Sequence, residues 1–302
     1  MLIEYHRTML ADKARNDAFY EALKRVIKPG ETSVADIGCG TGLLGFMAAK
    51  LGAKQVYMYE QASIGAVAFQ LAKDNKIKNV KFFEGSSLED DNPPQVDVVV
   101  SETLGNYAFE EHIIQTLNDA RQRFLKADGV IMPQGVKQFV APVVTRRLYN
   151  ELAVWDRVGY GLNFDLCKTM SMNNIYVRSF NESDLLEAQQ WDAVTFDKEN
   201  TSNRKGNAAW TAAQDLTVYG FAVWWECELV NGISISTGPA SPVTHWEQLY
   251  FPVEKPVDVK QGEKFTCTLS SQTTPETGSI IKWQLEHKGT RQNMTLEKGY
   301  LD

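Results

Sequence analysis

Long hydrophobic runs are missing from this sequence. Its 302 residues contain no uninterrupted apolar stretch of about 18 residues, the length that a membrane-spanning helix needs. The first ten residues, MLIEYHRTML, carry charges where a secretory signal peptide has its apolar core. We therefore expect no membrane span and a cytoplasmic location, or a nuclear one if the organism is eukaryotic.

Paired cysteines are missing as well. The four cysteines lie far apart and form no Cys-x-x-Cys pair: Cys39, Cys167, Cys227 and Cys267. Disulfide-rich secreted domains and cysteine-based zinc sites both depend on closely spaced cysteines. The sequence therefore predicts reduced thiols and no metal site.

A strongly basic composition and internal repeats are also absent. The chain has 31 Lys and Arg residues against 38 Asp and Glu residues, a net charge of −7. Direct nucleic-acid binding needs a basic surface, so we expect no nucleic-acid partner. The mild negative charge is compatible with a cationic partner. No repeat with a period of about 20 to 50 residues is present, which excludes a solenoid.

What the sequence does contain is an alternation of helix and strand patterns over residues 1–138. Short apolar strand patterns are found at residues 33–38, 55–60, 79–85 and 96–102. Helical patterns separate them, and a long helix is expected over residues 112–129, before a short strand at 130–133. Strand and helix in turn predict a doubly wound parallel sheet with helices on both faces.

The pattern changes from residue 139 to residue 302, where short strands of alternating polarity predict an antiparallel β domain. Residues 148–170 interrupt this rhythm with a helical, aromatic segment that is broken by Gly-Tyr-Gly. The pattern alone leaves two interpretations open. The segment is either an arm that packs on another subunit or a helical hairpin within its own subunit.

A glycine-rich turn ends the first strand of the parallel sheet. In VADIGCGTG, Gly38, Gly40 and Gly42 allow a sharp turn and a close approach of the backbone to a ligand. Asp36 precedes the turn, and Glu60 ends the second strand, where a carboxylate is suited to accept hydrogen bonds from a ribose. A solvated strand end is the plainer interpretation of Glu60. The acidic-x-Gly-x-Gly-x-Gly spacing differs from the dinucleotide fingerprint and resembles the S-adenosylmethionine loop of class I methyltransferases.

Two carboxylates follow the fourth strand in SETLGNYAFEE, residues 101–111. Glu102 and Glu111 would repel each other unless a cation lay between them, and a guanidinium can bond to carboxylates in two directions. Such a grip would aim one nitrogen of the guanidinium at a sulfonium methyl group, with alignment and electrostatics supplying most of the catalysis. Glu110 precedes a helix, and we expect it only to be solvated or to favour the helix dipole.

Four separated segments together resemble the protein arginine methyltransferases. They are the N-terminal HRTMLADKAR (6–15), the cofactor segment 34–60, the double-glutamate loop 101–111 and the Thr-His-Trp loop in SPVTHWEQLYF (241–251). The segments occur in the family's order and span nearly the whole chain. The resemblance implies a Rossmann-like methyltransferase domain, then a β-barrel-like domain with a helical dimerisation arm at about 148–170.

The resemblance also implies S-adenosyl-L-methionine as the cofactor and assigns residues to it. Asp36, Gly38 and Gly40 would shape the cofactor loop. Glu60 would hold the ribose hydroxyls, and Arg15 would meet the methionyl carboxylate.

Further roles follow from the same resemblance. His6 would lie near the cofactor, and Glu89 near the adenine. Met9 would lie near the target nitrogen, and His245 and Trp246 would close the substrate side, with His245 counted among the catalytic residues beside the two glutamates.

The sequence departs from the family pattern at two places. Thr103 and Leu104 stand where Trp-Met usually follows the first glutamate, and the sequence has no counterpart of the tyrosine-bearing helix that precedes the His6 segment. Three hypotheses remain. The first is an enzyme that methylates arginine in proteins or peptides and forms a homodimer through the arm. The second is a catalytically weak regulatory partner of an active relative, and the third is a methyltransferase of free arginine or another small guanidine.

Overall fold

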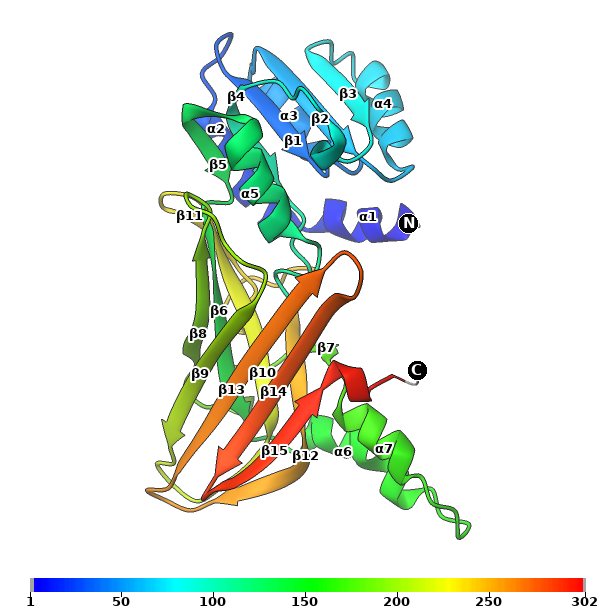
Figure 1. The fold of residues 1–302 in the computed structure, drawn as a ribbon, viewed down its shortest axis with the longest axis vertical. Helices are drawn as coiled ribbons and strands as arrows, with labels where there is room; N and C mark the ends of the chain where they lie inside the picture. Colours follow the sequence, from blue (N-terminus) through cyan, green and yellow to red (C-terminus); the bar gives the residue numbers. More distant parts are fainter. Residues whose placement is uncertain (1–2, 301–302) are drawn as a thin grey trace.

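The computed structural model describes residues 3–300 and contains two domains joined end to end (Figure 1). The first domain is a five-stranded, fully parallel sheet with the strand order β3-β2-β1-β4-β5. Its strands are β1 (Ser33–Ile37), β2 (Gln55–Glu60), β3 (Val80–Glu84), β4 (Val96–Ser101) and β5 (Leu125–Met132). Its helices are α1 (Ile3–Ala11), α2 (Lys13–Val26), α3 (Leu43–Lys50), α4 (Gly65–Asp74) and α5 (Ile113–Arg123). The predicted doubly wound α/β architecture is confirmed.

The strand order reverses between β1 and β4, which pair directly with each other. In β4 the apolar run Val98 to Val100 is buried, as expected of a strand covered on both faces. Because adjacent parallel strands end at the same edge, the loop after β1 and the loop after β4 lie side by side. Ligands of open α/β sheets bind at this kind of reversal point.

The long helix expected over residues 112–129 is wrong in its second half. Helix α5 ends at Arg123, and the following residues already belong to β5, which begins at Leu125 and pairs with β4. Leu125, Val130, Ile131 and Met132 pack in the core. Pairing with a buried neighbouring strand therefore overrides the helical pattern of the sequence.

The second domain consists of two antiparallel sheets that face each other in a barrel-like body (Figure 1). One sheet has the order β7-β12-β10-β6-β8, with β11 attached to β10, and the other has the order β15-β14-β13-β9. The first sheet is made of β6 (Gly135–Val143), β7 (Tyr176–Arg178), β8 (Gln189–Thr195), β10 (Leu216–Val230), β11 (Ile233–Ser236) and β12 (Gln248–Val259). The second is made of β9 (Arg204–Thr211), β13 (Lys264–Thr274), β14 (Gly278–His287) and β15 (Thr290–Thr295).

The predicted division between residues 138 and 139 falls inside β6, which pairs along its whole length with β10. The change from the first sheet to the second therefore takes place between Met132 and Gly135, a few residues earlier than the alternating pattern suggested. One continuous apolar core runs through both domains, from the parallel sheet to residues such as Trp225 and Trp283.

The segment expected as an arm leaves the barrel between β6 and β7. It contains α6 (Arg147–Leu152), a 3₁₀ helix (Ala153–Arg157) and α7 (Asp165–Met172). In Figure 1 it projects from the end of the barrel that is remote from the parallel sheet. The loop of this segment exposes large apolar side chains: Tyr160 is 91% exposed and Leu162 is 64% exposed.

Candidate functional site

The glycine turn after β1 packs tightly against the loop after β4 and against α1. Gly38 and Gly40 have φ values of 74° and 55°, which favour glycine. A Cβ on Gly38 would lie 2.8 Å from Cγ2 of Thr103, and one on Gly40 would lie 3.3 Å from Cε1 of His6. The positive φ values and these short contacts favour glycine at both positions. We call this closely packed turn the glycine cradle.

Two carboxylates hold the ends of this turn. Asp36 is buried and accepts a hydrogen bond from the backbone N–H of Gly45 at 2.7 Å. Glu60 accepts one from Gly40 N–H and one from Ala62 N–H, both at 2.8 Å. Burial, reinforced by the charge of Glu60, raises the pKa of Asp36 to about 7.

His6 and Glu89 border the same region. His6 is 5% exposed, and its buried Nε2 has no hydrogen-bond partner within residues 3–300. Burial lowers the pKa of this imidazole. Glu89 lies after β3, with Oε2 3.9 Å from the position of a Cβ on Gly85. The glycine cradle and the orphaned His6 nitrogen fit a ligand with hydrogen-bonding groups above the turn.

Asp12 joins the first domain to the Thr-His-Trp loop, a role that the sequence pattern does not predict. It is the N-cap of α2, where its Oδ1 accepts from Arg15 N–H at 3.0 Å. Its Oδ2 bonds to both the backbone N–H and Nδ1 of His245, at 2.9 and 2.8 Å. Burial would raise the pKa of Asp12, but the hydrogen bonds from His245 and Arg15 outweigh it and lower the pKa. An aspartate directly before a helical pattern signals an N-cap, but the sequence gives no signal for the contact with His245.

Arg15 lies against Glu102 in a buried ion pair. Both Nε and one terminal nitrogen of Arg15 donate to Oε2 of Glu102, the former at 2.8 Å. The other terminal nitrogen donates to Asn16 at 2.7 Å. The two side chains are only 7% and 5% exposed. Arg15, which the sequence predicted as a cofactor contact, therefore pairs with the first glutamate of the loop after β4.

Glu111 lies within electrostatic reach of Glu102. The surrounding protein atoms, together with the charges of Glu102, Glu110 and Glu60, raise the pKa of Glu111 to about 7. Because the residue still has surface open to water, solvent screening moderates this repulsion. A cation placed between the two carboxylates would relieve it.

Glu110 is exposed, as expected of a solvated residue, but it does not cap the helix that follows. The helix starts at Ile113 with His112 as its N-cap, and no side chain caps it. Glu110 instead folds back over Gly105, where a Cβ would lie 2.0 Å from its Oε1. Partial desolvation by the neighbouring protein atoms raises the pKa of Glu110, while the backbone N–H groups of Asn106 and Tyr107 act in the opposite direction.

Side chains of the barrel domain hold the loop between the two glutamates through the backbone carbonyl groups of that loop. Trp246 Nε1 donates to Leu104 O at 2.7 Å, and Trp225 Nε1 donates to Gly105 O at 3.1 Å. Asn106 Nδ2 in turn donates to Trp246 O at 2.5 Å. Trp246 is 2% exposed and packs edge-on against Trp225, so in this conformation it contacts the loop and faces away from the open side of the site. Met9, on α1, is half-buried.

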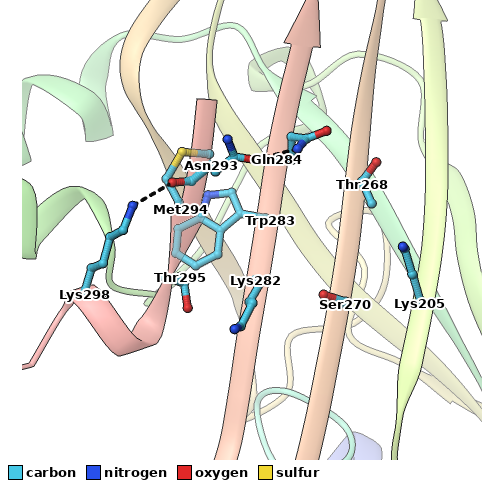
Figure 2. A pocket seen from close by; sticks show the side chains of 10 residues that line it. All are labelled: Lys205, Thr268, Ser270, Lys282, Trp283, Gln284, Asn293, Met294, Thr295 and Lys298. Atoms are coloured by element: carbon cyan, nitrogen blue, oxygen red, sulfur yellow. Dashed lines mark hydrogen bonds between the residues drawn. The ribbon is translucent and has the colours of Figure 1, made fainter. Parts of the chain in front are cut away.

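Two hollows lie outside the glycine cradle. One, of about 310 Å³, opens where the glutamate loop meets the barrel and is lined by Phe109 and His112 on one side and by Asn200 and Thr273 on the other. The other, of about 230 Å³, lies on the sheet β15-β14-β13-β9. Figure 2 shows its lining, which includes Lys205, Lys282, Lys298, Thr268, Ser270 and Thr295. The residues that line the second hollow include no carboxylate and none of the predicted site residues.

The described part of the chain offers neither a metal cluster nor a membrane helix. Residues 3–300 contain no group of three or more His, Cys, Asp and Glu side chains arranged to hold a metal ion. Within the same residues, every helix is too short or too polar to cross a membrane.

Comparison with known proteins identifies relatives along the whole chain. Residues 136–290 match the family model described as the arginine methyltransferase oligomerization subdomain, and residues 19–157 match that of the ribosomal protein L11 methyltransferase. Protein arginine N-methyltransferase 6 of Xenopus tropicalis is 29% identical over 280 residues, which cover 87% of this chain and 82% of that protein. Arginine N(omega)-methyltransferase of Streptomyces achromogenes subsp. streptozoticus is 30% identical over 282 residues, covering 88% and 75% of the two chains.

The fold has close counterparts among solved structures. The Trypanosoma brucei PRMT1 enzyme–prozyme heterotetrameric complex with AdoHcy superimposes with a TM-score of 0.87 at 22% identity, covering 98% of each chain. The structure of PRMT6 with SAH gives a TM-score of 0.76 at 20% identity, covering 94% of this chain and 100% of that one. The predicted second domain, a β domain of barrel-like form, is confirmed by this likeness.

The buried Asp36 yields a prediction about stability and pH. Its pKa rises from 3.8 to about 7 on folding, so its contribution favours the folded state in acid and is lost as the pH rises through 7. Asp36→Asn removes the charge and keeps an acceptor for Gly45 N–H. We expect the ligand-free variant to gain on the order of 1–3 kcal/mol over the wild type at about pH 8, and close to nothing at about pH 4.

Urea unfolding at both pH values measures this difference. Asp91→Asn, on the loop before β4, is the control for loss of an exposed carboxylate. A gain of equal size at both pH values would show that the charge of Asp36 is not its cause.

Proposed function

The chain belongs to the protein arginine N-methyltransferase family, and from this premise we propose that it transfers a methyl group from S-adenosylmethionine to a guanidinium nitrogen of arginine in a protein or peptide. The observation that carries the proposal is the placement of Glu102 and Glu111. Both belong to the loop after β4, beside the glycine cradle that follows β1, and their charges are coupled.

The residues around the cradle are proposed to hold the cofactor. Asp36, Gly38 and Gly40 shape the turn, and Glu60 lies at the tip of β2, where its carboxylate can exchange backbone partners for ribose hydroxyls. The orphaned nitrogen of His6 offers a further polar contact. When bound, S-adenosylmethionine supplies an electrophilic methyl group on a positively charged sulfur.

Arg15 and Glu89 are assigned to the two ends of the cofactor. Arg15 remains the proposed partner of the methionyl carboxylate, since its guanidinium has N–H donors beyond those that bond to Glu102 and Asn16. Glu89, near Gly85 at the end of β3, is proposed to lie beside the adenine.

The glutamate pair is proposed to grip the acceptor guanidinium from two sides. Arg15 forms an ion pair with Glu102 and fixes the orientation of its carboxylate. Glu111 then bonds to the other side of the substrate guanidinium, which leaves one nitrogen facing the cradle. Met9, on α1, is proposed to border that nitrogen.

A proton must leave the nitrogen during the reaction. A carboxylate with a pKa near 7 accepts a proton more readily at neutral pH than one that is tied to a cation. Glu111 is therefore the proposed acceptor of the proton, at its carboxylate oxygen. His245 is proposed to border the acceptor, held in place by Asp12.

Two alternative functions have specific support. The Streptomyces relative is named an arginine N(omega)-methyltransferase, which favours a free guanidine as acceptor. The Trypanosoma structure is described as an enzyme–prozyme complex, which favours a weak partner subunit. Against the first, the Xenopus relative is named a protein arginine N-methyltransferase. Against the second, Glu102, Glu111 and His245 are all present, and a scaffold does not need them.

Dimer formation through the arm is part of the proposal. The family model that matches residues 136–290 describes an oligomerization subdomain, and these residues include the arm. The apolar side chains Tyr160, Leu162 and Leu166 are exposed in the single chain, and a second copy would cover them.

A methyl-transfer assay tests the function. Protein and methyl donor are incubated with an arginine-rich peptide, with free arginine or with neither acceptor, and products are identified by mass spectrometry. We expect methylated peptide, and a loss of about 10²-fold or more in Glu102→Gln because one side of the grip is neutralised. Cofactor binding, measured by calorimetry, should change little in this variant.

Each acceptor gives a distinct outcome in this assay. Methylated free arginine without methylated peptide would favour the small-guanidine function, and cofactor binding without any transfer would favour the partner subunit. Glu226→Gln, an exposed carboxylate on β10, is the matched control and should keep full activity.

The raised pKa of Glu111 predicts the pH dependence of the reaction. An acid loses its proton as the pH rises, and only the ionised carboxylate grips the guanidinium. The value of kcat/KM for the peptide should therefore rise about tenfold per pH unit below 7 and level off above it. A bound guanidinium stabilises the carboxylate, so the corresponding limb in kcat should lie at lower pH.

The variant Glu111→Gln tests whether Glu111 causes the rise of kcat/KM below pH 7. Its residual activity should show no dependence on pH near 7. If the limb persists unchanged in Glu111→Gln, another group is responsible, and the proposed role of Glu111 is wrong.

The dimer proposal predicts the behaviour of arm variants. Replacing Leu162 and Leu166 together with Glu places two charges on the surface that the second copy would cover, so the protein should sediment as a monomer in analytical ultracentrifugation. Tyr300→Glu, which charges an exposed aromatic outside the arm, should leave the dimer intact. A monomeric wild type at micromolar concentration would contradict the proposal.

A further inference from the structure

We propose that Tyr107 is a positioning residue, and that a buried hydrogen-bonded chain from the barrel to its hydroxyl fixes the loop that carries Glu102 and Glu111. This inference rests on the proposed function. The loop has no regular secondary structure between the end of β4 at Ser101 and the start of α5 at Ile113. Tyr107 lies near its middle, so anchoring this residue restrains both halves of the loop.

The hydroxyl of Tyr107 has two partners inside the barrel. The ring is 2% exposed and packs edge-on against Phe109, with centroids 5.9 Å apart. The hydroxyl lies 2.5 Å from Ser271 Oγ on β13, and Gln138 Nε2 on β6 donates to it at 3.3 Å. Since Gln138 donates, the proton of Tyr107 is free to go to Ser271. Burial raises the pKa of Tyr107 to about 12, so the hydroxyl keeps its proton at neutral pH.

The chain continues to an ion pair on the neighbouring strands. Gln138 Nε2 also donates to Oδ2 of Asp192 on β8, at 3.2 Å. Arg204 on β9 donates through Nε to the same oxygen at 2.8 Å, and its terminal nitrogen bonds to Oδ1. The Asp192 and Arg204 side chains are 6% and 15% exposed. The amide of Gln138 is therefore held by a fixed acceptor and presents its other N–H to Tyr107.

This anchor differs in kind from the indole contacts of the same loop. Trp246 and Trp225 bond to backbone carbonyls, which any residue at positions 104 and 105 would supply. The hydroxyl contact depends on the tyrosine side chain itself. Its loss would leave Ser271 and Gln138 with unpaired polar groups inside the barrel and would let the middle of the loop move.

Substitution at both ends of the contact tests the inference. In Tyr107→Phe, we expect kcat for the peptide to fall between about five- and a hundredfold, because small displacements of aligned groups are costly, while KM for the methyl donor stays within about twofold. Ser271→Ala should give a loss of the same kind. The double variant should lose no more than Tyr107→Phe alone, since both substitutions remove one contact.

The matched control is Tyr250→Phe. Tyr250 is also buried, and its hydroxyl donates to Tyr219 O at 2.6 Å, in the smaller apolar cluster away from the loop. Its substitution costs one buried hydrogen bond without touching the loop, so its kcat should match that of the wild type. If both Tyr→Phe variants lose kcat equally, the effect of Tyr107 comes from the loss of a buried hydrogen bond in general and not from the loop. This result would overturn the inference.

Hydrogen exchange of the loop amides separates this inference from the proposed function. Residues 103–111 should exchange faster in Tyr107→Phe than in the wild type or in Tyr250→Phe. A wild type that transfers no methyl group would refute the function while the exchange still reports on the anchor. Unchanged exchange, or unchanged kcat in an active enzyme, would refute the anchor.

Discussion

The bonding of the barrel to the loop between Glu102 and Glu111 is the constraint on which the geometry of the site depends. Leu104, Gly105, Asn106 and Tyr107 are consecutive, and each is hydrogen-bonded to a barrel residue. The parallel sheet fixes where this loop begins and where α5 resumes, but the path between them is set by the second domain. Two distant stretches of sequence thus define the position of one pair of carboxylates, and the two domains also share a continuous apolar core.

Several carboxylates lie close together around the glycine turn and the glutamate loop, and the positive charges of the folded chain do not fully balance them. Asp36 and Glu111 both have pKa values raised to about 7, and each feels the charges of Glu60 and Glu102. Arg15 lowers the pKa of Asp36 in part, but its guanidinium is already paired with Glu102. Both proposed ligands, a sulfonium and a guanidinium, are cations. Their binding would therefore relieve strain that the folded chain retains, a common arrangement at functional sites.

The sequence predicted the structure correctly where a local conformation or burial pattern restricts the choice of residue. Glycines at 38 and 40 require positive φ, and the apolar run before Glu102 forms a buried strand, so the glycine turn and the glutamate loop could be placed at one edge of the sheet. Tertiary contacts decided the rest. The end of α5 depends on the pairing of β5, and the position of Glu110 depends on the space over Gly105. Neither of these contacts leaves a local pattern in the sequence.

The departure from the family pattern at Thr103 illustrates how closely the two loops are fitted. Cγ2 of Thr103 would lie 2.8 Å from a Cβ on Gly38, so the residue after the first glutamate fills the space that the missing glycine side chain leaves. Ser101, just before Glu102, donates from Oγ to Ile37 O at 2.8 Å, next to Gly38. The residues on both sides of Glu102 thus contact the end of β1. Any shift of the glycine turn would be passed to Glu102 through direct packing, so the proposed cofactor side and the proposed acceptor side would be coupled without a separate moving element.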